Sequence, residues 1–277
     1  MNWGLWGKNL SEKLMTQLIE EAISVGINSF DHADIYGGYT TEESFGKALS
    51  VSKINRESVF LISKCGIQYP SEKRPLKVKY YDYSKRHIRF SVENSLKNLK
   101  TEYLDLFLLH RPSPLMNINE ISDEINKLKN EDKIKSFGVS NFTNFQIQLI
   151  KTQTEILWNQ IEFSLTHNCS MFDGTLDYLK INNIGVMAWS PLGSYFKKKD
   201  EKYKRINILF NDLSKKYNCT HDQLLLAWIL KHPSNTYPII GTTEKKRLEL
   251  AVKAIEINLE IDDWFLILKA SDGKKVP

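Results

Sequence analysis

The chain has 277 residues, of which 42% are apolar and 26% charged, a composition typical of a globular protein that buries a core. Its net charge of +5 is mild for this length and gives no argument for nucleic-acid binding. Three scattered cysteines favour a reducing cytoplasm, and because there is neither a basic leader nor an apolar run near ~18 residues, we expect no signal peptide and no membrane span.

Short apolar runs alternate with helical patterns along the whole chain. The runs predict strands at residues 1–5, 27–31, 59–64, 104–110, 135–140, 156–160, 185–190 and 237–241. Helical spacing predicts helices at 12–25, 41–49, 84–99, 118–129, 143–151, 172–182, 205–217, 221–231 and 244–254. Strict alternation is typical of parallel strands joined by crossover helices, so we expect an α/β fold, a (β/α)8 TIM barrel that forms one domain over residues 1–277. The first strand would start at Met1, which leaves no hairpin to cover the bottom of the barrel.

Four residues that could do chemistry lie at or near the carboxyl ends of these strands. Asp31, Lys64 and His110 each close a strand, and Tyr36 follows Asp31 by five residues. In an α/β barrel the carboxyl ends of successive strands converge on one mouth, where active sites lie. We therefore expect the four side chains to be neighbours. Each of them alone is more often structural, since a strand-end Asp often caps a helix and a Lys at the mouth often only pairs an acid.

Together the four residues suit proton transfer to a carbonyl oxygen. The unperturbed pKa of a Tyr is about 10, which makes it a poor acid or base at neutral pH. A neighbouring ammonium stabilises the phenolate and lowers that pKa, so Lys64 is expected to tune Tyr36 while Asp31 holds Lys64. His110 would hydrogen-bond the substrate oxygen as a hydride reaches the carbon. We interpret three other histidines as structural and Asp34 as a residue that orients its loop; the histidines are His32, His167 and His232.

The segments around these residues resemble those of the aldo-keto reductase family. Asp31-His-Ala-Asp-Ile-Tyr36-Gly-Gly is similar to the segment that carries the family's Asp and Tyr. Phe60-Leu-Ile-Ser-Lys64 is similar to the segment with its Lys, and residues 103–112 are similar to the segment with its His. The resemblance covers nearly the whole chain in the right order and is nearest to a bacterial branch of predicted oxidoreductases. It implies NADPH-dependent reduction of aldehydes or ketones, with hydride transfer from nicotinamide C4 and Tyr36 as the proton donor.

The resemblance also implies which residues bind the cofactor. Ser140, Asn141 and Gln160 match strand ends that bind the nicotinamide carboxamide, and their side chains offer the donors and acceptors that orient an amide. Trp189 offers a flat face for ring stacking, with core packing as the alternative, and Gly193 lets backbone N–H groups approach a pyrophosphate. The same segment contributes two more candidates, Ser190 and Leu192.

The last predicted strand and the helix after it resemble the family's site for the adenosine 2′-phosphate. Arg247 matches the family's Arg and Thr242 its Ser, whereas Gly241 stands where the family often has Lys. The chain also departs from the commonest pattern at Leu250 and Ala251. We expect NADP to be preferred over NAD, with the neighbouring Lys245 and Lys246 either compensating for the missing Lys or serving only as surface charges.

We expect a cytoplasmic monomer that acts on a small carbonyl compound without metal, flavin, nucleic acid or membrane. Two other functions stay open. One is a cofactor-binding regulatory or partner-binding protein on the same barrel. Turnover of a generic aldehyde with NADPH would distinguish a reductase from this alternative. The other is a metal-dependent barrel hydrolase, which would use Asp31, His32, Asp34 and His110. Its Asp-His-x-Asp spacing is poor for a strand, because alternate residues of a strand face opposite ways. The short tail after Ile261 indicates an open pocket that tolerates many substrates.

Overall fold

The structure, a computed structural model, describes residues 3–275 and forms two compact units. The first comprises the described part of Met1–Asn159 together with Gly241–Lys245, and the second comprises Gln160–Ile240 with the described part of Lys246–Pro277. The prediction of a single domain over the whole chain stays a prediction.

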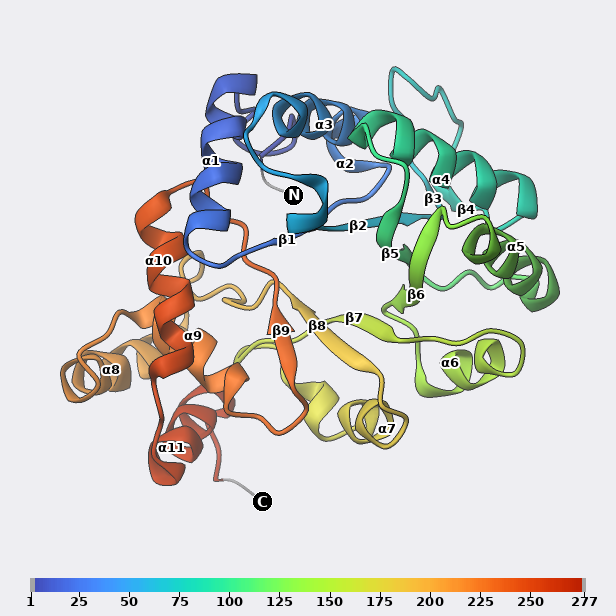
Figure 1. Ribbon diagram of the computed structural model, residues 1–277. Coiled ribbons are helices and arrows are strands. Elements are labelled where there is room, and N and C mark those ends of the chain that lie inside the picture. Colours follow the sequence, from blue (N-terminus) through green and yellow to red (C-terminus); the bar gives the residue numbers. More distant parts are fainter. Residues whose placement is uncertain (1–2, 276–277) are drawn as a thin grey trace. The chain divides into compact units, whose positions relative to one another are not determined.

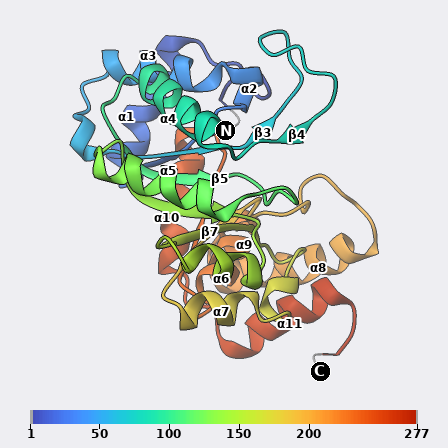
Figure 2. The same cartoon turned by 90° about the vertical axis from the view of Figure 1, so that its right-hand side faces the viewer.

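The sheet agrees with the predicted α/β fold. Its strand order is β1-β2-β5-β6-β7-β8-β9, and the pairs β1–β2, β2–β5, β5–β6 and β8–β9 are parallel. The strands are β1 Ser29–Asp31, β2 Phe60–Cys65, β5 Leu104–Leu109, β6 Ile134–Ser140, β7 Trp158–Glu162, β8 Gly185–Trp189 and β9 Thr236–Pro238. A separate antiparallel hairpin pairs β3 Ile67–Gln68 with β4 Tyr80–Tyr81. Its connecting loop, residues 69–79, extends well beyond the two short strands (Figure 2).

Helices follow the strands as expected (Figure 1). In the first unit they are α1 Glu12–Ser24, α2 Tyr36–Tyr39, α3 Thr41–Val51, α4 Lys85–Leu99, α5 Ile118–Asn130 and α6 Asn144–Lys151. In the second they are α7 Thr175–Ile181, α8 Glu201–Lys216, α9 His221–Leu230, α10 Lys245–Lys253, which begins at the last residue of the first unit, and α11 Ile261–Asp272. Single turns of 3-10 helix lie at Arg56–Ser58, Cys169–Met171 and Ala254–Glu256. Among the helices of residues 3–275, none combines the length and apolar character that crossing a bilayer requires.

The predicted first strand, residues 1–5, is wrong for residues 3–5. Met1 and Asn2 lie outside the described residues, and residues 3–8 form turns. The reason is that backbone groups here bond within the segment: the Gly4 carbonyl accepts from Gly7 and Asn9, and the Trp3 carbonyl accepts from Leu10. The Trp3 indole packs against Phe30 and Phe45, so the apolar pattern reflects burial rather than a strand.

The core of the first unit lies between its strands and the helices outside them. Leu106, Phe107 and Leu108 of β5 are fully buried, and α4 turns an apolar face with Ile88 and Val92 inward. This pattern is what spacing of three and four residues predicts for a helix that covers a sheet. The strand ends are thereby fixed by a packed core.

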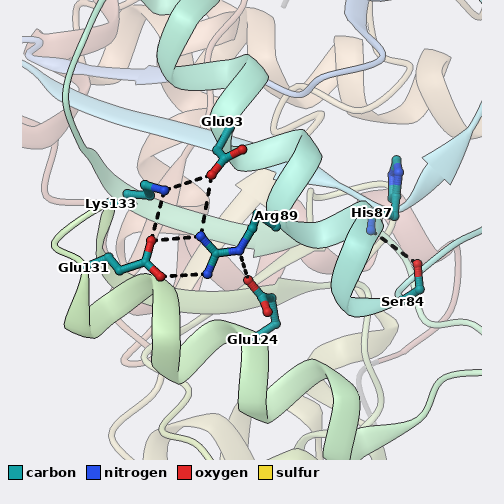
Figure 3. A network of polar contacts seen from close by, with 7 residues as sticks. All are labelled: Ser84, His87, Arg89, Glu93, Glu124, Glu131 and Lys133. Atoms are coloured by element: carbon teal, nitrogen blue, oxygen red, sulfur yellow. Dashed lines mark hydrogen bonds and ion pairs between the residues drawn. The ribbon is translucent and has the colours of Figure 1, made fainter.

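The outer faces of α4 and α5 are joined by an ion-pair network (Figure 3). Arg89 donates from Nε to Glu124 at 2.6 Å and forms two bonds of 2.8 Å with Glu131. Lys133 pairs with Glu131 at 2.9 Å and with Glu93 at 2.8 Å. Since the Glu124 side chain is only 5% exposed, Arg89 supplies the charge that its burial requires.

In the second unit, two tryptophans fix α11 against α9. Trp228 and Trp264 stack with ring centroids 4.9 Å apart and planes 6° from parallel. Each indole N–H donates to the other residue's carbonyl, at 3.2 Å from Trp228 and 2.9 Å from Trp264. The helix α11 was not predicted, because the expected barrel was complete before it.

Candidate active site

Lys64 is the centre of a buried polar cluster in the first unit. It lies on β2, is fully buried and donates to three acceptors. Its ammonium lies 2.7 Å from Asp31 Oδ2, 2.7 Å from the His32 carbonyl oxygen and 3.2 Å from the Tyr36 hydroxyl. A lysine ammonium has three N–H donors, so each has a partner. The structure thus brings the predicted Asp, Lys and Tyr together.

The charges of this cluster shift the pKa values of its members. Burial lowers the pKa of Lys64, but Asp31 and Tyr36 outweigh burial and the net pKa is raised. For Tyr36, burial raises the pKa above its ordinary value and exceeds the lowering by Lys64. Lys64 therefore acts in the predicted direction, while the net direction is opposite to the prediction. A phenol with a raised pKa is protonated at neutral pH, the state that a proton donor must have.

His110 completes the group at the end of β5. Its backbone N–H donates to the Cys65 carbonyl at 2.9 Å, and its ring stands edge-on to Tyr36 with centroids 5.7 Å apart. Burial, followed by the charge of Lys64, lowers its pKa well below the usual range, so the ring is neutral. Its Nδ1 is buried and makes no hydrogen bond within the described residues. A neutral imidazole has one donor and one acceptor nitrogen, so the ring beside the phenol can take part in hydrogen bonding without carrying a charge.

An unusual backbone places Tyr36 at the start of α2. The two residues that follow, Gly37 and Gly38, have φ values of 62° and 65°. A Cβ added to Gly37 would lie 2.6 Å from Thr41 Oγ1, so no larger residue fits there without rearrangement. The Tyr36 ring packs against a small apolar cluster of Ala33, Ile35 and Ile67. These contacts hold the phenol where Lys64 reaches it.

Two buried carboxyls near the cluster have pKa values above their usual range. Asp34, predicted to orient its loop, donates its backbone N–H to the Lys64 carbonyl at 3.0 Å and accepts from Ser91 Oγ at 3.4 Å. Burial, with a smaller effect of Glu42, raises its pKa to about 8. The Glu42 carboxyl accepts from Ser63 at 2.5 Å and from Ser95 at 2.9 Å, and burial raises its pKa. Sequence reasoning missed Glu42, although a Glu on the apolar side of a predicted helix was a usable signal.

Four of the predicted cofactor residues belong to the first unit. Ser140 ends β6 and is buried, and its Oγ accepts from Asn141 Nδ2 at 2.7 Å. Asn141 has a left-handed φ of 61°. Gly241 is exposed, and the carbonyl of Thr242 accepts from the Trp3 indole at 2.9 Å.

The other predicted cofactor residues belong to the second unit. Gln160 is buried on β7, and Trp189 is half-buried at the end of β8. The turn after β8 contains Ser190, Leu192 and Gly193, and the Gly193 N–H closes it on the Ser190 carbonyl at 2.8 Å.

Gly193 must be glycine at this turn. Its φ is 54°, and an added Cβ would lie 2.1 Å from Thr166 Oγ1.

Arg247 is exposed in the first turn of α10, next to Lys245 and Lys246, which suits recognition of a phosphate. The donor set fits a phosphorylated dinucleotide, and the roles of the individual residues stay predictions.

The ligand set of the metal-dependent hydrolase does not assemble. Asp31 is engaged by Lys64, and the His32 ring lies 4.3 Å from the ring of Phe45 in the core. Asp34 is turned toward Ser91. In the described part of the chain, no group of three or more His, Cys, Asp or Glu side chains could hold a metal ion.

Comparison with known proteins identifies close relatives of the chain. The sequence model of the Aldo/keto reductase family matches residues 1–272. The chain is 39% identical to the uncharacterized oxidoreductase YcsN of Bacillus subtilis, over 99% of this chain and 94% of that protein. It is 37% identical to the oxidoreductase YdhF of Escherichia coli, over 99% of this chain and 93% of that protein.

Solved structures share the fold. A thermostable aldo-keto reductase, Tm1743, in complex with the inhibitor epalrestat, has a TM-score of 0.82 and 27% identity, covering 97% of this chain and 93% of its own. An aldo/keto reductase of Klebsiella pneumoniae in complex with NADP and acetate has a TM-score of 0.77 and 25% identity, covering 92% and 84%. With the seven-stranded sheet and its surrounding helices, these likenesses confirm the predicted (β/α)8 fold class.

Proposed function

The chain belongs to the aldo/keto reductase family, and from this premise we propose that it reduces aldehydes or ketones to alcohols with NADPH. The observation that carries the proposal is the contact of one buried ammonium with both a carboxylate and a phenol, beside a neutral imidazole. When bound, NADPH supplies the hydride. NADP in the Klebsiella relative supports this choice of cofactor.

In the proposed mechanism, Tyr36 is the proton donor. A carbonyl oxygen placed between Tyr36 and His110 would accept hydrogen bonds from both, which orients it and stabilises negative charge that develops on it. The Tyr36 proton then moves to that oxygen. The Lys64 ammonium stabilises the resulting phenolate, and Asp31 keeps that ammonium charged and in place.

Ten residues are proposed to bind NADPH. Backbone N–H groups after β8 suit the pyrophosphate, and Arg247 suits the 2′-phosphate. The proposed set is Ser140, Asn141, Gln160, Trp189, Ser190, Leu192, Gly193, Gly241, Thr242 and Arg247.

We also infer that the protein acts as a monomer in the cytoplasm, on small carbonyl compounds and without a nucleic-acid partner. Its mild net charge supports the absence of a nucleic-acid partner. Its three cysteines are all free, as suits a reducing compartment.

A panel of carbonyl compounds tests the proposal. Purified protein with NADPH is expected to consume the cofactor, followed by its absorbance, with at least one aldehyde or ketone. Tyr36→Phe measured in parallel controls for contaminating reductases. NADPH binding without turnover of any member would reject the reductase function and favour the regulatory alternative.

A further inference from the structure

Tyr39, at the end of α2, has a strained backbone. Its φ is 70°, in the left-handed region that glycine tolerates and an aromatic residue rarely adopts. It follows two glycines in the same conformation, Gly37 and Gly38, and lies three residues after Tyr36. Such strain persists only where the surroundings hold it and is common at functional sites.

Three parts of Tyr39 hold the loop of residues 69–79. Its hydroxyl accepts the N–H of Tyr69 at 2.8 Å and donates to the carbonyl of Tyr69 at 3.2 Å. Its own carbonyl accepts from Lys73 Nζ at 3.2 Å. The Arg74 guanidinium lies over its ring, 4.0 Å from the centroid, a cation–π contact. One strained residue thus fixes the loop at three points.

The loop belongs to the same side of the unit as the proposed catalytic group. The hairpin that carries it begins at Ile67, three residues after Lys64, at the carboxyl end of β2. Just beyond β4, the Tyr83 hydroxyl accepts the backbone N–H of Arg111, the residue after His110, at 3.1 Å. Barrel enzymes build their substrate pockets from loops at these strand ends.

The loop is also fixed from its other side. Arg74 donates to Gln68 Oε1 at 3.0 Å, and Gln68 Nε2 lies 2.6 Å from His87 Nε2 on α4. The ring of Tyr69 meets the exposed Trp6 edge-on at 5.2 Å. Tyr39 is the member of this set that joins the loop directly to the segment presenting Tyr36.

We propose that Tyr39 is a positioning residue that holds loop 69–79 against the Tyr36 segment as a wall of the substrate pocket. This rests on the proposed function. With the tether intact the wall is ordered before the substrate arrives, whereas without it the loop is ordered only on binding. Ordering the loop on binding costs free energy that the bound substrate must supply, so loss of the tether raises KM and leaves kcat nearly unchanged.

Tyr39→Phe tests the proposal, because it removes the hydroxyl but keeps the backbone and the ring beneath Arg74. We expect KM for the carbonyl substrate to rise about tenfold, with kcat and the Kd for NADPH within about twofold. Trypsin is expected to cut the loop after the exposed Lys77 and Lys79 about tenfold faster than in the parent. Tyr80→Phe, which removes an exposed hydroxyl from the same hairpin, is the matched control and should change neither quantity.

The rise in KM and the faster cleavage by trypsin must occur together in Tyr39→Phe. A Tyr39→Phe protein that matches the parent, or in which only KM or only cleavage changes, would overturn the proposal. Arg74→Leu attacks the tether from the loop side and must give the same pair of changes, which guards against misfolding of one variant. If the parent turns over no carbonyl compound, the proposed function fails, while the cleavage rates still decide whether Tyr39 holds the loop.

Discussion

The Lys64 ammonium and the Tyr36 hydroxyl lie 3.2 Å apart, although the two residues come from a strand and a helix 28 positions apart in sequence. The ammonium is held beside the phenol because its other two donors bond Asp31 and the His32 carbonyl, and moving it away would weaken these bonds to a buried charge. The phenol is therefore solvated by a group that does not have to reorganise during reaction, which is the basis of electrostatic preorganisation.

Replacing Tyr36 with Phe is expected to lower kcat for carbonyl reduction by about 10²–10⁴-fold, the range for loss of a general acid. NADPH affinity should stay close to that of the parent, since the proposed cofactor residues are unchanged. Steady-state kinetics and a fluorescence titration measure the two effects. Turnover close to normal would reject Tyr36 as the proton donor.

Lys64→Met should slow reduction at neutral pH at least about tenfold, because the phenolate loses its cation and the pKa of Tyr36 rises further. The partly buried Asp31 loses its partner, so the free energy of unfolding should fall by up to about 3–5 kcal/mol. The double variant Lys64→Met/Asp31→Asn should regain stability but not activity. A pH–rate profile of folded Lys64→Met equal to the parent's would contradict the relay.

Asp34 makes folding stability depend on pH. Its pKa is raised from 3.8 to about 8 in the folded protein, so folding favours the protonated carboxyl. Its stabilising contribution is complete below pH 4 and is lost as pH rises toward 8, with a slope of at most about 1.4 kcal/mol per pH unit. Denaturant unfolding of the parent should weaken over this range relative to Asp34→Asn. The exposed Asp262→Asn is the control, and parallel curves for the parent and Asp34→Asn would refute the assignment.

Arg247→Ala should weaken NADPH far more than NADH, because only NADPH carries the 2′-phosphate. A charge-assisted hydrogen bond is worth roughly 1.5–3 kcal/mol, which corresponds to about 10- to 150-fold in affinity. Lys253→Ala removes the same charge from the last turn of the same helix and is expected to have little effect. Equal losses for both cofactors in a fluorescence titration would count against a phosphate site at Arg247.

The sequence predicted the proposed catalytic group because its members follow a simple rule of parallel sheets. Asp31 ends β1, Lys64 lies one residue before the end of β2, and His110 directly follows β5, and parallel strands bring their carboxyl ends to one side. The net pKa of Tyr36 could not be predicted, since it depends on burial outweighing a neighbouring charge, and burial is a property of packing. Strand alternation also could not reveal that Trp3 packs its ring from a turn.

What sequence patterns alone left out is mostly side-chain pairing across distant segments. The serine hydroxyls that donate to the Glu42 carboxyl lie 21 and 53 residues away in sequence, at Ser63 and Ser95. The helix α11 was not predicted because the expected barrel was complete before it, and the stacking of Trp264 on Trp228 of α9 is a pairing across 36 residues that no local pattern reveals. The roles proposed for the cofactor residues stay predictions.

The stacked pair of Trp228 and Trp264 has a spectroscopic consequence. Indoles whose planes are 6° from parallel at 4.9 Å couple their electronic transitions, and this coupling gives an exciton signal in circular dichroism when the two transition dipoles are rotated relative to each other within their planes. Because the two rings come from α9 and α11, the signal exists only while these helices are docked. The chain therefore carries an optical reporter of its C-terminal helix, and local undocking of α11 could be followed without any added label.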